Sequence, residues 1–141
     1  MVQRIKTVEE YLGEPIDIPC DVIELVTKWK KDTWYEVKDN PITDKYDAIA
    51  KLISSLGTLK NIKLSIELVV ESEHSFTRKD INHIVIGRRI SIISGLHEFC
   101  HVLYPEAEER WVQRWAAQTF KKTFPISFKK LKVDGDLLKK K

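Results

Sequence analysis

The length of 141 residues suits one domain with one hydrophobic core, so residues 1–141 are predicted to form a single compact unit. Hydrophobic residues make up 43% and charged residues 32% of the chain, and no apolar run approaches the ~18 residues that span a bilayer. The net charge of +3 is too small to argue for a nucleic-acid partner, and residues 1–6 lack the apolar core of a secretory signal, so we expect a cytoplasmic protein with no membrane partner.

Three helices are predicted in the first part of the chain. Residues 7–10 have the spacing of a capping box, and Gly13 would end the short helix that follows them. Pro19 suits the first turn of a second helix. Thr43 or Asp44 can cap a third helix, which would end before Gly57. Each of these two helices has an apolar stripe at a spacing of three to four residues: Val22, Leu25, Val26 and Trp29 in one, and Tyr46, Ile49, Ala50, Ile53 and Leu56 in the other.

The hydrophobic period changes to two after the third helix. Residues 62–70 alternate between apolar and mostly polar side chains, which predicts a half-buried strand. Residues 71–80 are polar and are predicted to be a connection. Residues 82–86 are apolar and β-branched and end at Gly87, which predicts a second strand.

Two further helices are predicted, over residues 91–104 and 106–122, with Pro105 between them. The predicted class is α+β, with N-terminal helices packed on a small sheet and two helices after it. Residues 123–141 are predicted to be a basic C-terminal tail, since eight lysines lie between Lys121 and Lys141. We interpret it as a solvated tail, with nucleic-acid binding, membrane binding and covering of a cleft as the alternatives.

The helix over residues 91–104 carries the motif His97-Glu98-Phe99-Cys100-His101. At 100° per residue, His97 and His101 lie about 40° apart on one helix face, so their imidazoles can share one zinc ion. Glu98 lies to the side, where it can take a proton from a metal-activated water without binding the metal. The motif therefore predicts a zinc site with Glu98 as general base.

A catalytic zinc ion has three protein ligands and one open position, so the third ligand must come from outside this motif. Pro105 lies four residues after His101, and Glu109 lies four residues after Pro105. If the chain reverses at Pro105, His101 and Glu109 both lie roughly 6 Å from the corner and can face each other. Glu108 is nearly as well placed, so the spacing favours Glu109 without excluding Glu108.

Residues 97–116 resemble the minigluzincin zinc metallopeptidases, and more distantly the peptidase half of ImmA-type regulators. Their sequence is HEFCHVLYPEAEERWVQRWA. The resemblance covers about residues 60–122. It implies a zinc peptidase with His97, His101 and Glu109 as metal ligands and Glu98 as base. It also implies that residues 82–87 form the edge strand that pairs with an extended substrate.

Several other residues near the motif either differ from the gluzincin pattern or have an ordinary structural interpretation. Gln113 stands where gluzincins often carry an aspartate that orients a histidine ligand. Tyr104 could donate to an oxyanion, although a plain tyrosine at a helix end is the favoured interpretation. Cys100 is interpreted as a small packed cysteine, because a fourth protein ligand would close the site. A bridge between Cys100 and Cys20 is not expected in the cytoplasm, and His74 and His83 are left without a role.

The leading hypothesis is a zinc-dependent peptidase that acts on a peptide or protein substrate. It includes a latent form in which residues 121–141 or the N-terminal helices cover the cleft. The alternatives are an ImmA-like regulatory protease and a non-catalytic module that binds protein or nucleic acid through the basic tail and the tryptophan-rich helix. The sequence leaves the cleavage preference and the oligomeric state open.

Overall fold

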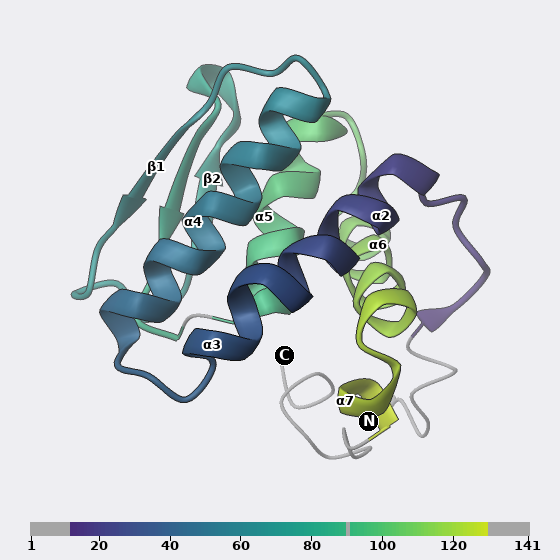
Figure 1. The fold of residues 1–141 in the computed structure, drawn as a ribbon. Coiled ribbons are helices and arrows are strands. Elements are labelled where there is room, and N and C mark those ends of the chain that lie inside the picture. The colour runs from purple at the N-terminus through teal and green to yellow at the C-terminus, as the bar shows by residue number, and fades with distance from the viewer. Residues whose placement is uncertain (1–11, 90, 130–141) are drawn as a thin grey trace, which may run out of the picture.

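The structure is a computed structural model that describes residues 12–89 and 91–129, and it has the predicted α+β class (Figure 1). Its strands are β1 (Ser65–Leu68), β2 (Phe76–Arg78) and β3 (His83–Ile86). Its helices are α2 (Cys20–Trp29), the π-helical segment η1 (Lys30–Trp34), α3 (Tyr35–Val37), α4 (Ile42–Leu59), the 3-10 turn η2 (Lys79–Ile81), α5 (Ile92–Leu103), α6 (Glu109–Thr123) and α7 (Pro125–Lys129). Within the described ranges, every helix is too short or too polar to cross a membrane.

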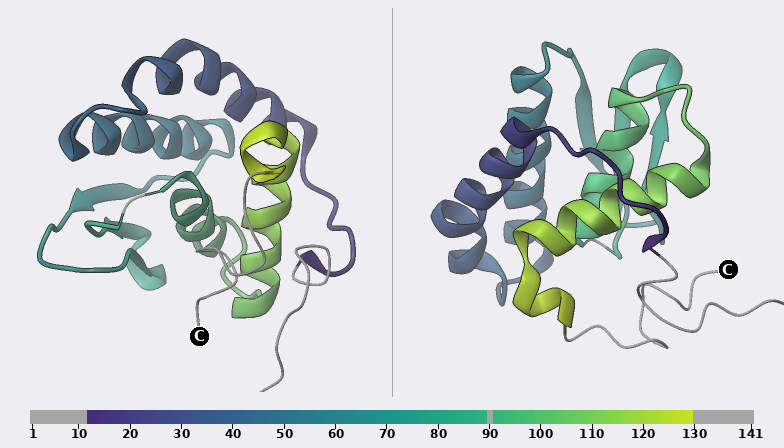
Figure 2. Two further views of the ribbon diagram at one scale, coloured as in Figure 1. Left: turned by 90° about the horizontal axis from the view of Figure 1, so that it is seen from below. Right: turned by 90° about the vertical axis from the view of Figure 1, so that its right-hand side faces the viewer.

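The helices are arranged in layers on one side of the sheet. Helices α4 and α5 lie against the sheet, and α2 packs on α4 and α6 (Figures 1 and 2). The prediction that the N-terminal helices pack on the sheet therefore needs correction for α2, whose apolar stripe meets other helices. Val22, Val26 and Trp29 of this stripe are buried, and the indole N–H of Trp29 donates to the carbonyl of Ala48 at 2.8 Å.

The predicted boundaries of α4 were wrong at both ends. The N-cap is Pro41 rather than Thr43 or Asp44, and the helix continues through Gly57 to Leu59. Gly57 is buried because the chain returns closely past it: a Cβ at this position would lie 3.0 Å from Cδ2 of Leu64. The left-handed residue after the helix is Asn61, with φ of 59°.

The sheet has the strand order β1-β3-β2, with β1 parallel and β2 antiparallel to β3. The predicted alternation of burial holds from Ile62 to Leu68, while Val70 is exposed. Strand β2 lies inside residues 71–80, which were wrongly predicted to be a connection. Its three residues are too few to show a hydrophobic period.

Strand β3 is the central strand, so the implied edge position of residues 82–87 was wrong. Its burial agrees with a central position, since Ile84, Val85 and Ile86 are all buried. The end strand beside α5 is β2 instead. This change matters because Thr77 at the middle of β2 reaches the motif helix.

The chain after α6 differs from the predicted tail. Residues 125–129 form α7, and Phe124 and Phe128 are buried in the hydrophobic core. Residues 123–129 are therefore part of the fold, while residues 130–141 lie outside the described residues.

At the other end, the predicted capping box at residues 7–10 also lies outside the described residues. Gly13, predicted to end that helix, has φ of 69°, a left-handed conformation that favours glycine.

The buried side chain of Gln118, which is 8% exposed, forms hydrogen bonds that connect residues 12–16 to α6. Its Nε2 donates to the carbonyls of Leu12 at 3.0 Å and Glu14 at 2.8 Å, and its Oε1 accepts from the backbone N–H of Ile16 at 2.7 Å. One amide thus satisfies three backbone groups of this segment.

We predict that Gln118→Met lowers the free energy of unfolding by roughly 2–4 kcal/mol, because the three backbone groups lose their partner. Urea denaturation measures this change. Lys122→Met, at an exposed position on the same helix, is the control and should stay close to the parent. A Gln118→Met protein as stable as the parent would show that water replaces the amide without loss.

Candidate metal centre

Helix α5 is held in place by its apolar face. Ser91 and Ser94 form a reciprocal capping box at its start, with the Ser91 hydroxyl accepting from the Ser94 N–H at 3.0 Å. Leu96 and Phe99 are fully buried in the core. His97 and His101 lie on a different side of the helix, and their side chains are 19% and 13% exposed. The anchored face therefore fixes where the two imidazoles point.

The turn between α5 and α6 brings an acidic residue back toward these imidazoles. Helix α5 ends at Leu103, and Pro105 disfavours helical backbone at Tyr104, whose φ and ψ are −127° and 72°. The Ala107 N–H then bonds to the Tyr104 carbonyl at 3.1 Å in a turn. As a result α6 begins at Glu109, three residues later than predicted, with Glu108 as its N-cap.

Glu109 contacts both histidines of the motif. Its Oε2 lies 2.9 Å from Nε2 of His97, and its Oε1 lies 3.0 Å from Nε2 of His101. The two Nε2 atoms are 3.2 Å apart. One ligand atom from each of the three residues can be chosen so that all lie within 4.8 Å of one another. The structure thus brings together the three side chains that the sequence marked as metal ligands.

The donor set fits a zinc ion. Two imidazole nitrogens and a carboxylate oxygen are ordinary zinc ligands, and ligands about 2.1 Å from a tetrahedral ion lie about 3.4 Å from one another. The observed separations of 2.9, 3.0 and 3.2 Å are a few tenths of an ångström shorter. Small outward rotations of the three side chains would therefore suffice to admit the ion.

The surroundings favour the form of His101 that binds a metal. The pKa of His101 is lowered, mainly because the ring is partly buried. The nearby Glu109 carboxylate partly opposes this shift, and the positive charge of Lys79 adds to it. A lower pKa keeps the ring neutral over a wider range of pH, and the neutral imidazole is the form that coordinates metal.

The residues around the three ligands depart from a usual zinc site in two ways. Nδ1 of His101 is buried and has no hydrogen-bond partner in the described part of the chain, so no acceptor orients the ring from the Nδ1 side. Gln113 was placed where an aspartate often orients a histidine ligand. Its Nε2 instead donates to Oε2 of Glu109 at 3.3 Å, so it orients the acidic ligand.

Glu98 lies in the same cavity as the three ligands. The cavity has a volume of about 260 Å³ and is lined by Ser75, Phe76, Thr77, Lys79, His97, Glu98, His101 and Glu109. Glu98 is buried, at 7% exposure, and its Oε1 accepts a hydrogen bond from the Thr77 hydroxyl at 2.7 Å. The four lining residues from residues 75–79 were not found from sequence, because only the pairing of β2 with β3 brings them there.

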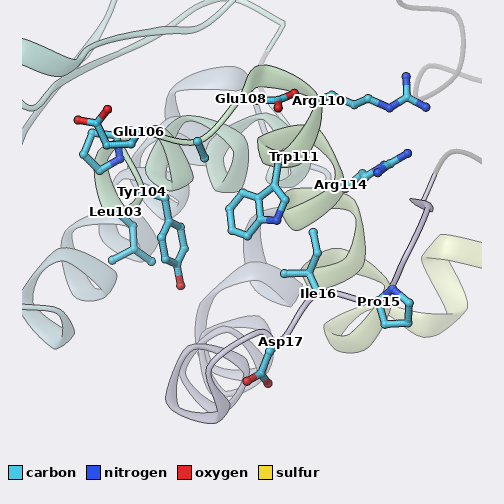
Figure 3. Close-up of a pocket in the computed structure, with 12 residues that line it drawn as sticks. Pro15, Ile16, Asp17, Leu103, Tyr104, Glu106, Glu108, Arg110, Trp111 and Arg114 are labelled. Atoms are coloured by element: carbon cyan, nitrogen blue, oxygen red, sulfur yellow. The ribbon is translucent and has the colours of Figure 1, made fainter.

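Other candidates from the sequence lie elsewhere. Glu108 and Tyr104 line a separate hollow of about 1050 Å³ that shares no lining residue with the metal cavity (Figure 3). The Tyr104 ring meets Trp111 edge to face there, at 5.1 Å between centroids, which agrees with the favoured interpretation of Tyr104 as a packed tyrosine at a helix end. Figure 3 also shows Trp111 in the middle of this hollow, between Tyr104 and Ile16.

The remaining cysteine and histidine residues have other surroundings. Cys100 is fully buried in the core and unbridged, as predicted, and burial raises the pKa of its thiol, which keeps it protonated. Cys20 is exposed and also free. His83 lies between the Ser65 hydroxyl, at 2.6 Å from Nδ1, and Oε1 of Glu67, at 2.9 Å from Nε2, and His74 is exposed.

The chain was compared with known protein families, with curated proteins and with solved structures, and none of them matches. The resemblance to minigluzincins therefore depends on the sequence motif alone.

We predict that the purified chain binds one zinc ion and that Glu109→Ala weakens this binding at least ~100-fold, because one of three protein ligands is lost. Competition with a zinc chelator measures the affinity. Glu108→Ala is a matched control, since it removes the neighbouring carboxylate that lines the other hollow. If Glu108→Ala weakened zinc binding and Glu109→Ala did not, the assignment of the third ligand would be overturned.

Proposed function

We propose that this protein is a zinc-dependent peptidase of the gluzincin type, with His97, His101 and Glu109 as metal ligands and Glu98 as general base. One observation carries the proposal: donor atoms of the three ligand residues converge in a small cavity that also contains a buried carboxylate. A structural zinc site would close all four positions with protein ligands. Among the described residues only these three donors converge, which suits a site with an open position.

In this proposal the bound zinc ion and the residues of the site have different roles in peptide hydrolysis. When bound, zinc acts as a Lewis acid that polarises the substrate carbonyl and makes water a better nucleophile at neutral pH. The Glu98 carboxylate takes a proton from the attacking water and returns it to the nitrogen of the leaving amine. The Glu109 side chain, 57% exposed, lies at the open side of the site, where a substrate can enter.

The end strand β2 supports binding of an extended peptide. It pairs with β3 along one edge, and its residues 76 and 77 line the metal cavity. We propose that the substrate adds to the other edge of β2 through backbone hydrogen bonds, which would place its scissile bond beside the cavity. This role was assigned to residues 82–87 from the resemblance, and the strand order moves it to β2.

The proposed latency has no support from the described N-terminal helices. All residues that line the metal cavity belong to residues 75–79, α5 and α6, so α2, α3 and α4 contribute none. Helix α7 contributes none either. The N-terminal helices and residues 121–129 therefore leave this cavity uncovered in the described part of the chain.

We predict that Glu98→Gln lowers kcat for peptide hydrolysis by about 10²- to 10⁴-fold, the usual contribution of a general base, while zinc stays bound. A quenched fluorescent peptide library and zinc analysis of the same samples measure both properties. Glu108→Gln is the control, because it makes the same chemical change outside the cavity. A Glu98→Gln protein that hydrolyses peptides at the parental rate would exclude Glu98 as the base.

A further inference from the structure

Thr77 points toward the motif helix because of its register in the sheet. It lies opposite Ile84 in the antiparallel pair of β2 and β3, and Ile84 is fully buried. Side chains alternate across a strand, so Phe76 and Arg78 lie on the other face, where the Arg78 guanidinium is 5.9 Å from the Phe76 ring centre. Thr77 is therefore the residue of β2 whose side chain forms hydrogen bonds with α5.

The hydroxyl of Thr77 contacts Glu98 at two points. It lies 2.7 Å from Oε1 of the Glu98 carboxylate and 3.2 Å from the backbone carbonyl of the same residue. A hydroxyl has one proton, and the shorter distance places it on the carboxylate. The contact with the backbone carbonyl keeps the hydroxyl close to Glu98.

This hydrogen bond restricts the orientation of a buried carboxylate. The terminal torsion of a glutamate is soft, so each hydrogen bond to a carboxylate oxygen narrows the range of orientations that the group can adopt. Fixing Oε1 also fixes the plane of the group and hence the place of the second oxygen. Threonine suits the task because its β-branched side chain has few rotamers, and its strand is hydrogen-bonded to the centre of the sheet.

We infer that Thr77 is the positioning residue of the catalytic base: its hydroxyl holds the Glu98 carboxylate in the orientation that proton transfer requires. This inference rests on the proposed peptidase function. A purely structural threonine, by contrast, would only attach β2 to α5.

The test compares Thr77→Val, which keeps the shape and removes the hydroxyl, with Thr77→Ser, which keeps the hydroxyl. For a fluorescent peptide that the zinc-loaded full chain cleaves, Thr77→Val should lower kcat by about 10- to 100-fold, the equivalent of one hydrogen bond to a charged group. KM and zinc content should stay near the parent, and Thr77→Ser should restore most of kcat. Thr123→Val is the control, because Thr123 is a buried threonine whose hydroxyl bonds only within α6.

The outcomes separate this inference from the proposed function. Unchanged kcat in Thr77→Val, with activity lost in Glu98→Gln, would overturn the role of Thr77 and leave the peptidase proposal standing. Equal losses of kcat in Thr77→Val and Thr77→Ser would also overturn it. If the zinc-loaded parent cleaves no peptide, crystal structures of the parent and Thr77→Val decide: the inference requires the carboxylate of Glu98 to rotate in the variant, and an unmoved carboxylate refutes it.

Discussion

The candidate metal centre depends on one interaction, the convergence of three electron-donating side chains. Two imidazole nitrogens and a carboxylate lie about as close as hydrogen-bonded atoms, at 2.9 to 3.2 Å. Their lone pairs repel unless a proton or a cation lies among them, so the arrangement favours binding of a positive ion. The fold holds the three groups from two sides, because α5 is anchored in the core and the turn after it delivers the first residue of α6.

The sheet contributes a hydrogen-bond donor and part of the lining on the side of the site where Glu98 lies. Strand β2 lies against α5, and its residue Thr77 lines the cavity together with the buried Glu98, while the Glu109 side chain is 57% exposed. A buried carboxylate requires hydrogen-bond donors, and the strand supplies one from Thr77. The same strand is an end strand of the sheet, so in the peptidase that we propose a single short segment both orients the base and pairs with the substrate.

Local patterns in the sequence predicted the motif helix well and its surroundings less well. The relation of His97 to His101 follows from helical periodicity alone, so it holds wherever that helix lies. The choice between Glu109 and Glu108 depends on where α6 begins. The prediction placed this start three residues too early, but Glu109 still contacts both histidines. Strand β2 and Thr77 could not be predicted, because a strand of three residues is determined by pairing with a distant segment. The central position of β3 is likewise a property of the whole sheet. The close approach of Leu64 to Gly57, which lies inside α4, also depends on the tertiary fold.

X-ray absorption spectroscopy at the zinc edge tests the identity of the metal ligands most directly. For the zinc-loaded full chain, we predict a shell of nitrogen and oxygen scatterers at about 2.0–2.1 Å, with the outer-shell pattern of two imidazoles and no sulfur. A sulfur shell at about 2.3 Å would place a cysteine on the metal and contradict the proposed ligands. A spectrum without imidazole scattering would contradict them equally.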